Sequence, residues 1–478
     1  MTGRSAGRLF KAGRLRRGIS EFLPFPLLMT AAFCVVAVLV ASLDRREGAP
    51  ALRAFAGRVV PASSATEFVG VVAASLMTVT SITFPVLLIA VQQTASSLGA
   101  VVFDQYLRRR ANQAYAGYFV GATAFSFVVL AFGDAGSAPV LGATAALLLT
   151  VGSLVALLLL IHSTVDQMRP ECVVSSIHEL ALRAHEGELR LLAGTRRERR
   201  SEPGSPGRDV PTPTGGYVVS IDARALAGVA GAAGPGAEVL LPCQLGTYLA
   251  SGETVATIVG VAAQDDRFDA RTLSAVTFDD TRRIEMDSGY SIAQLETIAW
   301  TTATSAQSPY TAGAAIHQLR DLVARWSAGE EDARTAPAGS PEPLPVVYAT
   351  GAIERVVRGL GELLSASSQS RQSGTAALLI TSFAHALPCL RTDYYRDQLL
   401  RSLDAALPSL TAQVGSPALV DALAGLEDAL AAAGRSTRGV RQVRAILGAA
   451  TEDLIPDPST LHELRVAGGP GTGETREV

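Results

Sequence analysis

Hydroxyl side chains crowd one apolar stretch of the sequence, and a row of oxygens in such a place could line a path for polar solutes. The stretch TVTSITFPVLLIAV carries its oxygens at Thr78, Thr80, Ser81 and Thr83, followed by Pro85. In an apolar helix a hydroxyl bonds back to the carbonyl four residues earlier or across to another helix. Proline removes a backbone donor and bends the helix. The pattern predicts either a pore- or cavity-lining face or ordinary helix packing in lipid.

A second candidate is a run of charged residues, DDTRRIEMDS, that precedes a predicted helix. Its cations are Arg282 and Arg283, and the nearest carboxylates are Glu285 and Asp287. Asp287 or Ser288 is a suitable N-cap, because a side-chain oxygen there accepts a hydrogen bond from the first backbone amides. The cluster predicts either a charged interface or regulatory site, or a salt-bridged surface corner.

Three further candidates stand where apolar stretches end. Gln92 follows the hydroxyl-bearing stretch, and Arg108, Arg109 and Arg110 end an amphipathic segment. That segment predicts a helix in the membrane interface or a continuation of the preceding span. Its arginines would lie at headgroup level, contact the soluble part, or form a solvated cluster. His162 ends the fourth apolar stretch, where it could act as a pH sensor or stay an interfacial side chain.

The composition disfavours several chemistries. Lys11 is the only lysine, so no other position offers a phosphate-binding, Schiff-base, lipoyl or biotinyl lysine. The net charge of −3 gives no electrostatic case for nucleic acid. No metal-ligand spacing joins the four cysteines, which are Cys34, Cys172, Cys243 and Cys389. Because nucleophile and phosphate-loop motifs are also lacking, we expect no cofactor, no metal and no enzymatic activity.

Four apolar runs are each long enough to cross a bilayer as a helix. A helix needs about 20 residues to span about 30 Å of hydrocarbon. No Asp, Glu, Lys or Arg occurs in the four runs, which cover residues 22–43, 68–91, 114–132 and 140–161. Small residues in the last two runs predict that these helices pack closely against their neighbours. These residues are Gly117, Gly121, Gly142 and Gly152.

The distribution of arginines orients these spans. With the N-terminus inside, a basic arm at residues 1–21, Arg108 to Arg110 and the residues after the last span carry the inner cations. The first outer loop holds four arginines and the second holds none. The excess favours both termini in the cytoplasm. We therefore expect a multi-pass protein with the lipid bilayer as its first partner.

The remaining two-thirds of the chain predicts a cytoplasmic α+β part. Within it, residues 238–258 resemble the hammerhead hairpin of biotinyl/lipoyl-type barrels without the carrier lysine. The fold class is thus an integral membrane domain of four transmembrane helices, a small barrel-like β module and a helical bundle. The expected segments after the spans (22–163) are a connecting helix at 164–194, a linker at 195–215, the α/β module at 216–326, a linker at 327–345, a helical C-terminal domain at 346–466 and a disordered tail at 467–478.

Three motifs in this order resemble one family. The segment SITFPVLLIAVQQTASS is similar to S-x-I-T-F-S-x-x-L-V-A-L-Q, and Ile161-His162 stands where the family has F-I-H-H. The segment DDTRRIEMDSGYSIAQLETIAW is similar to R-T-x-x-Q-D-x-x-F-G-x-R-Q-L-x-D-I-A. Over most of residues 20–330 the chain thus resembles the bacterial predicted membrane proteins filed as domain of unknown function 2254. The resemblance implies four spans and a cytoplasmic domain in the bacterial inner membrane, and it brings no known activity.

Two departures from the family pattern concern polar residues. The family continues A-L-S-P-x-I-N-D-P-F-T-A, and this chain reads TTATSAQSPYTA, with Gln307 and Ser308 in place of Asn and Asp. After the second span LGAV replaces S-P-R. If those polar residues serve a shared activity, this member has lost or changed it.

Two functions stay open at this point. The hydroxyl- and proline-bearing span favours a homo-oligomeric channel- or transporter-like protein gated by its cytoplasmic domain, since four spans enclose a pore only in an oligomer. The absence of ionisable residues from the middle of the spans disfavours that reading. The alternative is a membrane-anchored sensor or scaffold whose cytoplasmic domain binds a protein partner or a small ligand. The channel or transport role is the preferred hypothesis.

Overall fold

The computed structural model divides the chain into two compact units, Met1–Val173 and Val174–Val478. The basic arm predicted at 1–21, Gln307 with Ser308, and the tail predicted at 467–478 lie outside the described residues. The structure describes residues 23–45, 50–98, 101–132, 138–202, 204–262, 265–305, 309–334, 342–413 and 415–452.

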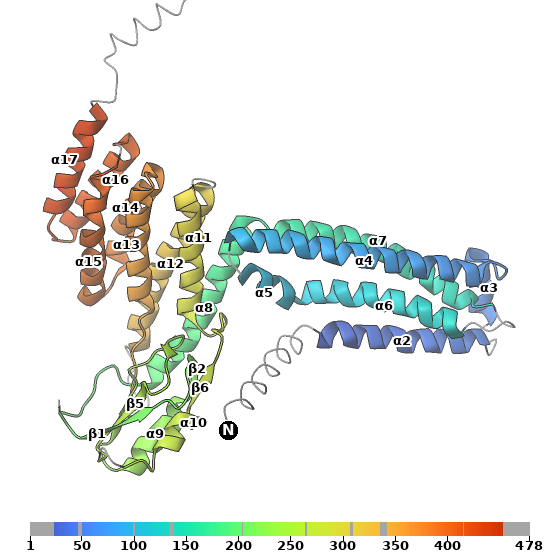
Figure 1. The fold of residues 1–478 in the computed structure, drawn as a ribbon, viewed down its shortest axis with the longest axis horizontal. Coiled ribbons are helices and arrows are strands. Elements are labelled where there is room, and N and C mark those ends of the chain that lie inside the picture. The colour runs from blue at the N-terminus through green and yellow to red at the C-terminus, as the bar shows by residue number, and fades with distance from the viewer. Residues whose placement is uncertain are drawn as a thin grey trace, which may run out of the picture. The chain divides into compact units, whose positions relative to one another are not determined.

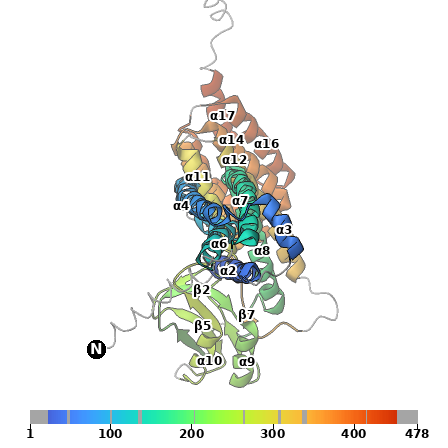
Figure 2. The same ribbon diagram turned by 90° about the vertical axis from the view of Figure 1, so that its right-hand side faces the viewer.

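The first unit is a bundle of long apolar helices. Four of its helices are long and apolar enough to cross a membrane, which confirms the four predicted spans. They run alongside one another (Figures 1 and 2) and are α2 (Pro24–Arg45), α4 (Ala65–Leu98), α6 (Arg110–Phe132) and α7 (Val140–Gln167). Two short helices join them, α3 (Pro50–Val59) and α5 (Val101–Arg108). The amphipathic segment before the arginines is therefore a separate helix and no continuation of the second span.

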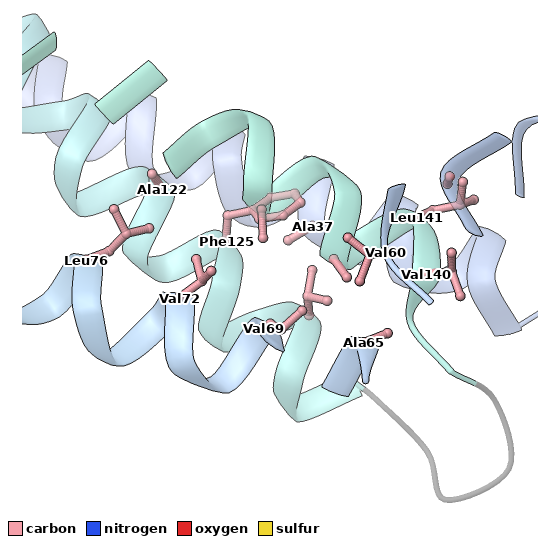
Figure 3. Close-up of a cluster of buried hydrophobic side chains, with 14 residues drawn as sticks. Ala37, Val60, Ala65, Val69, Val72, Leu76, Ala122, Phe125, Val140 and Leu141 are labelled. Atoms are coloured by element: carbon pink, nitrogen blue, oxygen red, sulfur yellow. The ribbon is translucent and has the colours of Figure 1, made fainter. Parts of the chain in front are cut away.

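The core of this unit is built from small and medium apolar side chains. Val69, Val72 and Leu76 on α4 lie against Ala122 and Phe125 on α6 (Figure 3). The glycines of α6 and α7 confirm the predicted close packing. A side chain at these positions would collide with a neighbouring helix: Gly117 with Met29, Gly121 with Phe33, Gly142 with Val129 and Gly152 with Tyr118.

One end of the bundle is closed by charged side chains that cap helices. Asp44, at the end of α2, is buried and accepts the backbone amides of Leu141 at 3.1 Å and Gly142 at 2.9 Å. A carboxylate in this place satisfies unpaired amides and opposes the positive end of α7. Arg45 caps a C-terminal helix end, because it donates to the carbonyl of Phe132, the last residue of α6. Capping thus accounts for one of the four arginines in the first predicted outer loop, Arg45.

The second unit begins with α8 (Pro170–Gly194) and two small sheets. One sheet has the order β1 (Gly207–Pro211), β5 (Thr254–Val259), β3 (Glu238–Leu240), β7 (Val346–Val347). The other has the order β4 (Tyr248–Leu249), β2 (Gly216–Ile221), β6 (Val276–Asp279). Helices α9 (Ala223–Ala233) and α10 (Asp269–Ser274) accompany them, and α9 contributes to the core of the larger sheet.

The predicted barrel-like module is wrong, because the strands of the described residues form two open sheets and close no barrel. The hairpin that resembled a barrel motif splits between the sheets, with β4 on β2 and β5 between β1 and β3. Strand β1 lies inside the predicted linker 195–215, and β7 arrives from beyond residue 345. Pairing partners so distant in sequence give no local signal.

Helical hairpins make up the rest of the second unit and stand side by side (Figure 1). Helix α11 packs on α13 and α13 on α15, while α12 packs on α14 and α14 on α16. The helical layer begins within the range 216–326 that the sequence assigned to the α/β module. Its helices are α11 (Ser288–Ser305), α12 (Pro309–Arg334), α13 (Ala352–Gln369), α14 (Ser373–Cys389), α15 (Asp393–Leu410), α16 (Pro417–Ala432) and α17 (Arg438–Glu452).

Replacement of the capping carboxylate tests the closure of the membrane bundle. We expect Asp44→Ala to lower the free energy of unfolding by about 1–2 kcal/mol, since two buried amides lose their acceptor. The midpoint of thermal unfolding in detergent measures the change. Ser42→Ala is the control, because Ser42 bonds only the Leu39 carbonyl of its own helix, and it should change the midpoint little. Equal shifts in the two variants would contradict the capping role.

Candidate functional site

The hydroxyl-bearing face of α4 is the first candidate site, and it points away from the core of the bundle. Thr78, Ser81 and Pro85 are exposed, and Thr80 and Thr83 are half-buried. Three hydroxyls bond back to their own helix: Thr78 to the Ala74 carbonyl at 2.9 Å, Thr80 to Leu76 at 2.7 Å and Ser81 to Met77 at 2.7 Å. The face therefore lines no interior space of a single copy.

This face differs from the outer faces of the other spans. The exposed side chains of α2 between residues 25 and 43 are apolar, and so are those of α7 between residues 148 and 161. Successive exposed positions on α4 follow the helical period and mix apolar with polar residues. The exposed polar side chains of that face are Ser75, Thr78, Ser81, Gln92, Gln93 and Ser96. Lipid tails offer these groups nothing to bond, so a polar row suits contact with protein or water.

The other predicted residues of the membrane unit lie on its surface and are not gathered into one site. Gln92 is exposed on α4, and His162 is exposed on α7. Arg108, Arg109 and Arg110 are exposed at the junction of α5 and α6.

Buried amides next to the arginines hold this junction. Asn112 donates to the Tyr106 carbonyl at 2.8 Å and to Gln167 at 3.2 Å, and Gln113 donates to the Leu107 carbonyl at 3.1 Å. The amides thus tie the end of α5 to α6 and to the end of α7.

A buried carboxylate, Glu188 on α8, is the centre of the second candidate site. It is 3% exposed. Ser288, the first residue of α11, donates its hydroxyl to Glu188 at 2.6 Å, and Thr350, just before α13, donates at 3.0 Å. One carboxylate therefore joins α8 to the N-terminal ends of two other helices, where negative charge is favoured.

Aromatic and imidazole side chains surround this carboxylate. His185 is buried, with its Nδ1 3.4 Å from a Glu188 oxygen, and it stacks on Trp326 with ring centroids 4.4 Å apart. The buried phenol of Tyr348 lies nearby, and desolvation followed by the Glu188 charge raises its pKa. Two turns before His185 on α8, His178 contacts Asp321 on α12 at 2.9 Å, and burial lowers the pKa of this histidine.

The predicted charged cluster divides into two separate ion pairs. Asp287 pairs with Arg282 at 2.7 Å, while Arg283 pairs with Asp279 at 3.0 Å. Asp287 also accepts the Tyr290 amide at 2.9 Å, which confirms the predicted N-cap of α11. The expected joint site of Arg283 with Asp287 is therefore not formed, and Asp287 has a capping role beside the Glu188 site.

Glycine gives the loop before β4 the room to pass this cap. Gly246 has a φ of +78°, a region that favours glycine. A side chain there would overlap the Asp287 carboxylate. The loop conformation and the helix cap thus depend on each other.

A second carboxylate with altered acidity lies further along α11. Burial raises the pKa of Glu296 to about 7, with a further contribution from the Glu362 carboxylate, against Arg358 and Arg355. Gly359 on α13 leaves the space that this carboxyl group occupies. Glu296 is therefore a group that changes charge near neutral pH at the contact between α11 and α13.

Reasoning from the sequence missed the Glu188 site. The residues come from three places far apart, around 185, 288 and 350, and α8 was predicted only as a connecting helix. The available signal was the row of His178, His185 and Glu188 on one amphipathic helix. The N-cap at Asp287, which the sequence did predict, marks one edge of the site.

Replacement of Glu188 tests whether it holds the three helices together. We expect Glu188→Ala to lower the free energy of unfolding of the second unit by about 2–4 kcal/mol, because two buried hydroxyls lose a charged acceptor. Hydrogen exchange at the first amides of α11 and α13 should increase most. Glu179→Ala on the same helix removes only an exposed pair with Arg183 and should change exchange little. Equal effects of both variants would exclude this role.

The acidity of Glu296 predicts a pH dependence of stability. Its pKa rises from 4.5 when unfolded to about 7 when folded, so between these values the folded state binds more protons. Stability contributed by the neutral acid is therefore present at pH 4.5 and is lost as the pH rises to about 7. We expect Glu296→Gln to gain about 3 kcal/mol over the wild type at pH 8 compared with pH 4.5. Parallel stability curves of the two proteins would refute this.

Comparison with known proteins places the chain in a family without assigning an activity. The family model described as "Predicted membrane protein (DUF2254)" matches residues 19–373, a range that contains all four spans and the whole Glu188 site. No curated protein and no solved structure matches the chain. Because the matched range covers most of the sequence, the chain belongs to the DUF2254 family of predicted membrane proteins.

Proposed function

We propose that this membrane protein is a homo-oligomeric, non-enzymatic channel- or transporter-like protein of the bacterial inner membrane. In it the α4 helices of several copies surround a common path, both termini lie in the cytoplasm, and the second unit gates the path. The observation that carries the proposal is the exposed polar row on α4, beside outer faces of α2 and α7 that are apolar. Several copies can shelter that row from lipid, whereas one copy leaves it exposed.

The orientation of the hydroxyls favours a cation or water in such a path. The hydroxyls of Thr78 and Ser81 each donate their single proton to a backbone carbonyl of α4. Toward the surface of the helix they therefore present only acceptor lone pairs. Pro85 has no N–H to donate to the Ser81 carbonyl, which adds another acceptor at this level of the helix. A face of acceptors replaces the hydration shell of a cation better than that of an anion.

A second candidate function, a membrane-anchored sensor, is favoured by the Glu188 site. Only Met168 and Arg169 separate α7 from α8, and α8 carries the carboxylate that holds the ends of α11 and α13. An occupant of the second unit that displaced these ends would act directly on the helix that continues the last span. The same coupling would serve as the gate in the channel proposal.

Ion flux in proteoliposomes tests the path along α4. We expect the wild type to pass monovalent cations and Thr78→Val to reduce the flux by about 3–10-fold, the value of one lost oxygen contact. Thr123→Val is the matched control, because Thr123 on α6 makes the same bond to its own helix at 2.8 Å. It should leave the flux unchanged.

Two outcomes would overturn the proposal. One is a wild-type flux that Thr78→Val does not alter, since the hydroxyl face would then line no path. The other is a monomer in detergent and in lipid nanodiscs, measured by light scattering. Flux lost equally in Thr78→Val and Thr123→Val would point to general destabilisation and would also count against the path.

A further inference from the structure

The hairpins of the second unit have two different edges. We call the edge where α11 ends and α12 begins, where α13 ends and α14 begins, and where α15 ends and α16 begins the tip edge. The opposite edge, where one hairpin connects to the next, is the link edge. Contacts along the stack confirm that equivalent helices run parallel: Ser402 bonds the Val357 carbonyl, and Gln413 bonds the Ser367 carbonyl ten residues further. The three tips therefore share one edge.

Charge is distributed unequally between the two edges. The sequence around the first tip, residues 297–319, contains no Asp, Glu, Lys or Arg, and neither does 405–420 around the third. Around the second tip, residues 363–390, Arg371 is the only charged residue. The link edge instead carries ion pairs, namely Arg391 with Asp332, Arg435 with Asp393 and Arg435 with Asp397. A soluble surface ordinarily carries both charges throughout.

Two large aromatic side chains stand out from the uncharged tip of the first hairpin. Trp300 on α11 is 46% exposed, and Tyr310 on α12 is 72% exposed. Both combine an apolar ring with one polar group. Such residues are enriched where apolar and aqueous phases meet, above all at the headgroup level of membranes.

Helix α8 shows which way this tip points. His178 contacts Asp321, and seven residues later on α8 His185 stacks on Trp326, so α8 and α12 run parallel. Helix α12 begins 12 residues before Asp321, and α8 begins 8 residues before His178. At 1.5 Å per residue, α12 reaches about 6 Å past the start of α8. The tip thus lies at the end of α8 that follows the last span after two residues.

We infer that the tip edge of the second unit, led by Trp300 and Tyr310, inserts into the headgroup layer of the bilayer that the first unit spans. Three independent features carry the inference: the missing charge, the two exposed amphipathic aromatics, and the position of the tip at the membrane-attached end of α8. Because the rings enter the interface and leave water, the contact stabilises the second unit at the membrane.

Tryptophan fluorescence tests the inference directly, because the chain has only two tryptophans and Trp326 is buried. The full chain is reconstituted in vesicles of phosphatidylcholine and phosphatidylglycerol, with and without acyl chains brominated near the headgroup. Bromine on contact quenches indole emission. We expect the wild type to lose emission in the brominated vesicles and Trp300→Phe, which retains Trp326, to lose none.

A charge placed on the tip gives the second arm of the test. We expect Tyr310→Glu to relieve the quenching of Trp300, because a carboxylate resists entry into the interface. Tyr394→Glu is the matched control: Tyr394 is 47% exposed but lies at the link edge, beside Asp393, and the variant should be quenched like the wild type. Equal emission of the wild type in brominated and unbrominated vesicles would overturn the inference. Quenching that Trp300→Phe or Tyr310→Glu left unchanged would overturn it too.

Discussion

A single desolvated carboxylate determines how the second unit is assembled. The Glu188 carboxylate is buried, and each of its two oxygens accepts a hydrogen bond, one from the Ser288 hydroxyl and one from the Thr350 hydroxyl. Because an unpaired buried charge is costly, the three chain segments meet in one arrangement. The sheets and the hairpin stack are both built outward from these helices. Loss of the carboxylate would therefore loosen more of the unit than a surface contact of the same strength.

The membrane unit obeys the complementary constraint, that no polar group can be left unpaired in hydrocarbon. Asp44 and Arg45 meet the unpaired ends of α7 and α6, and the hydroxyls of α4 bond their own backbone. Once these demands are met, the polar row on α4 remains on the surface of a single copy. The role proposed for this row is therefore contact between copies.

The sequence predicted the elements whose signal is local. Short stretches of neighbouring residues are enough to predict the four spans and the cap at Asp287. The structure contains both. The barrel prediction was wrong because sheet pairing is non-local: β3 pairs with β7 across about a hundred residues that contain the strands β4, β5 and β6 and three helices. The Glu188 site was missed for the same reason, since its three segments are far apart in sequence and come together only in the folded chain. Arg283 and Asp287 lie only four residues apart in the sequence and still pair with different residues.

The matched family range also separates two parts of the second unit. It ends at residue 373, the start of α14, so it contains α8, α11 and α13, which build the Glu188 site, and excludes most of the hairpin stack. In a stack each hairpin contacts only its neighbours, so hairpins can be added at the free end without disturbing the first. Beyond the matched range, the sequence at the tip edge stays free of Asp, Glu, Lys and Arg over residues 373–390 and 405–420. Solubility alone gives no reason for that composition, whereas a continuous contact of this edge with the membrane surface does.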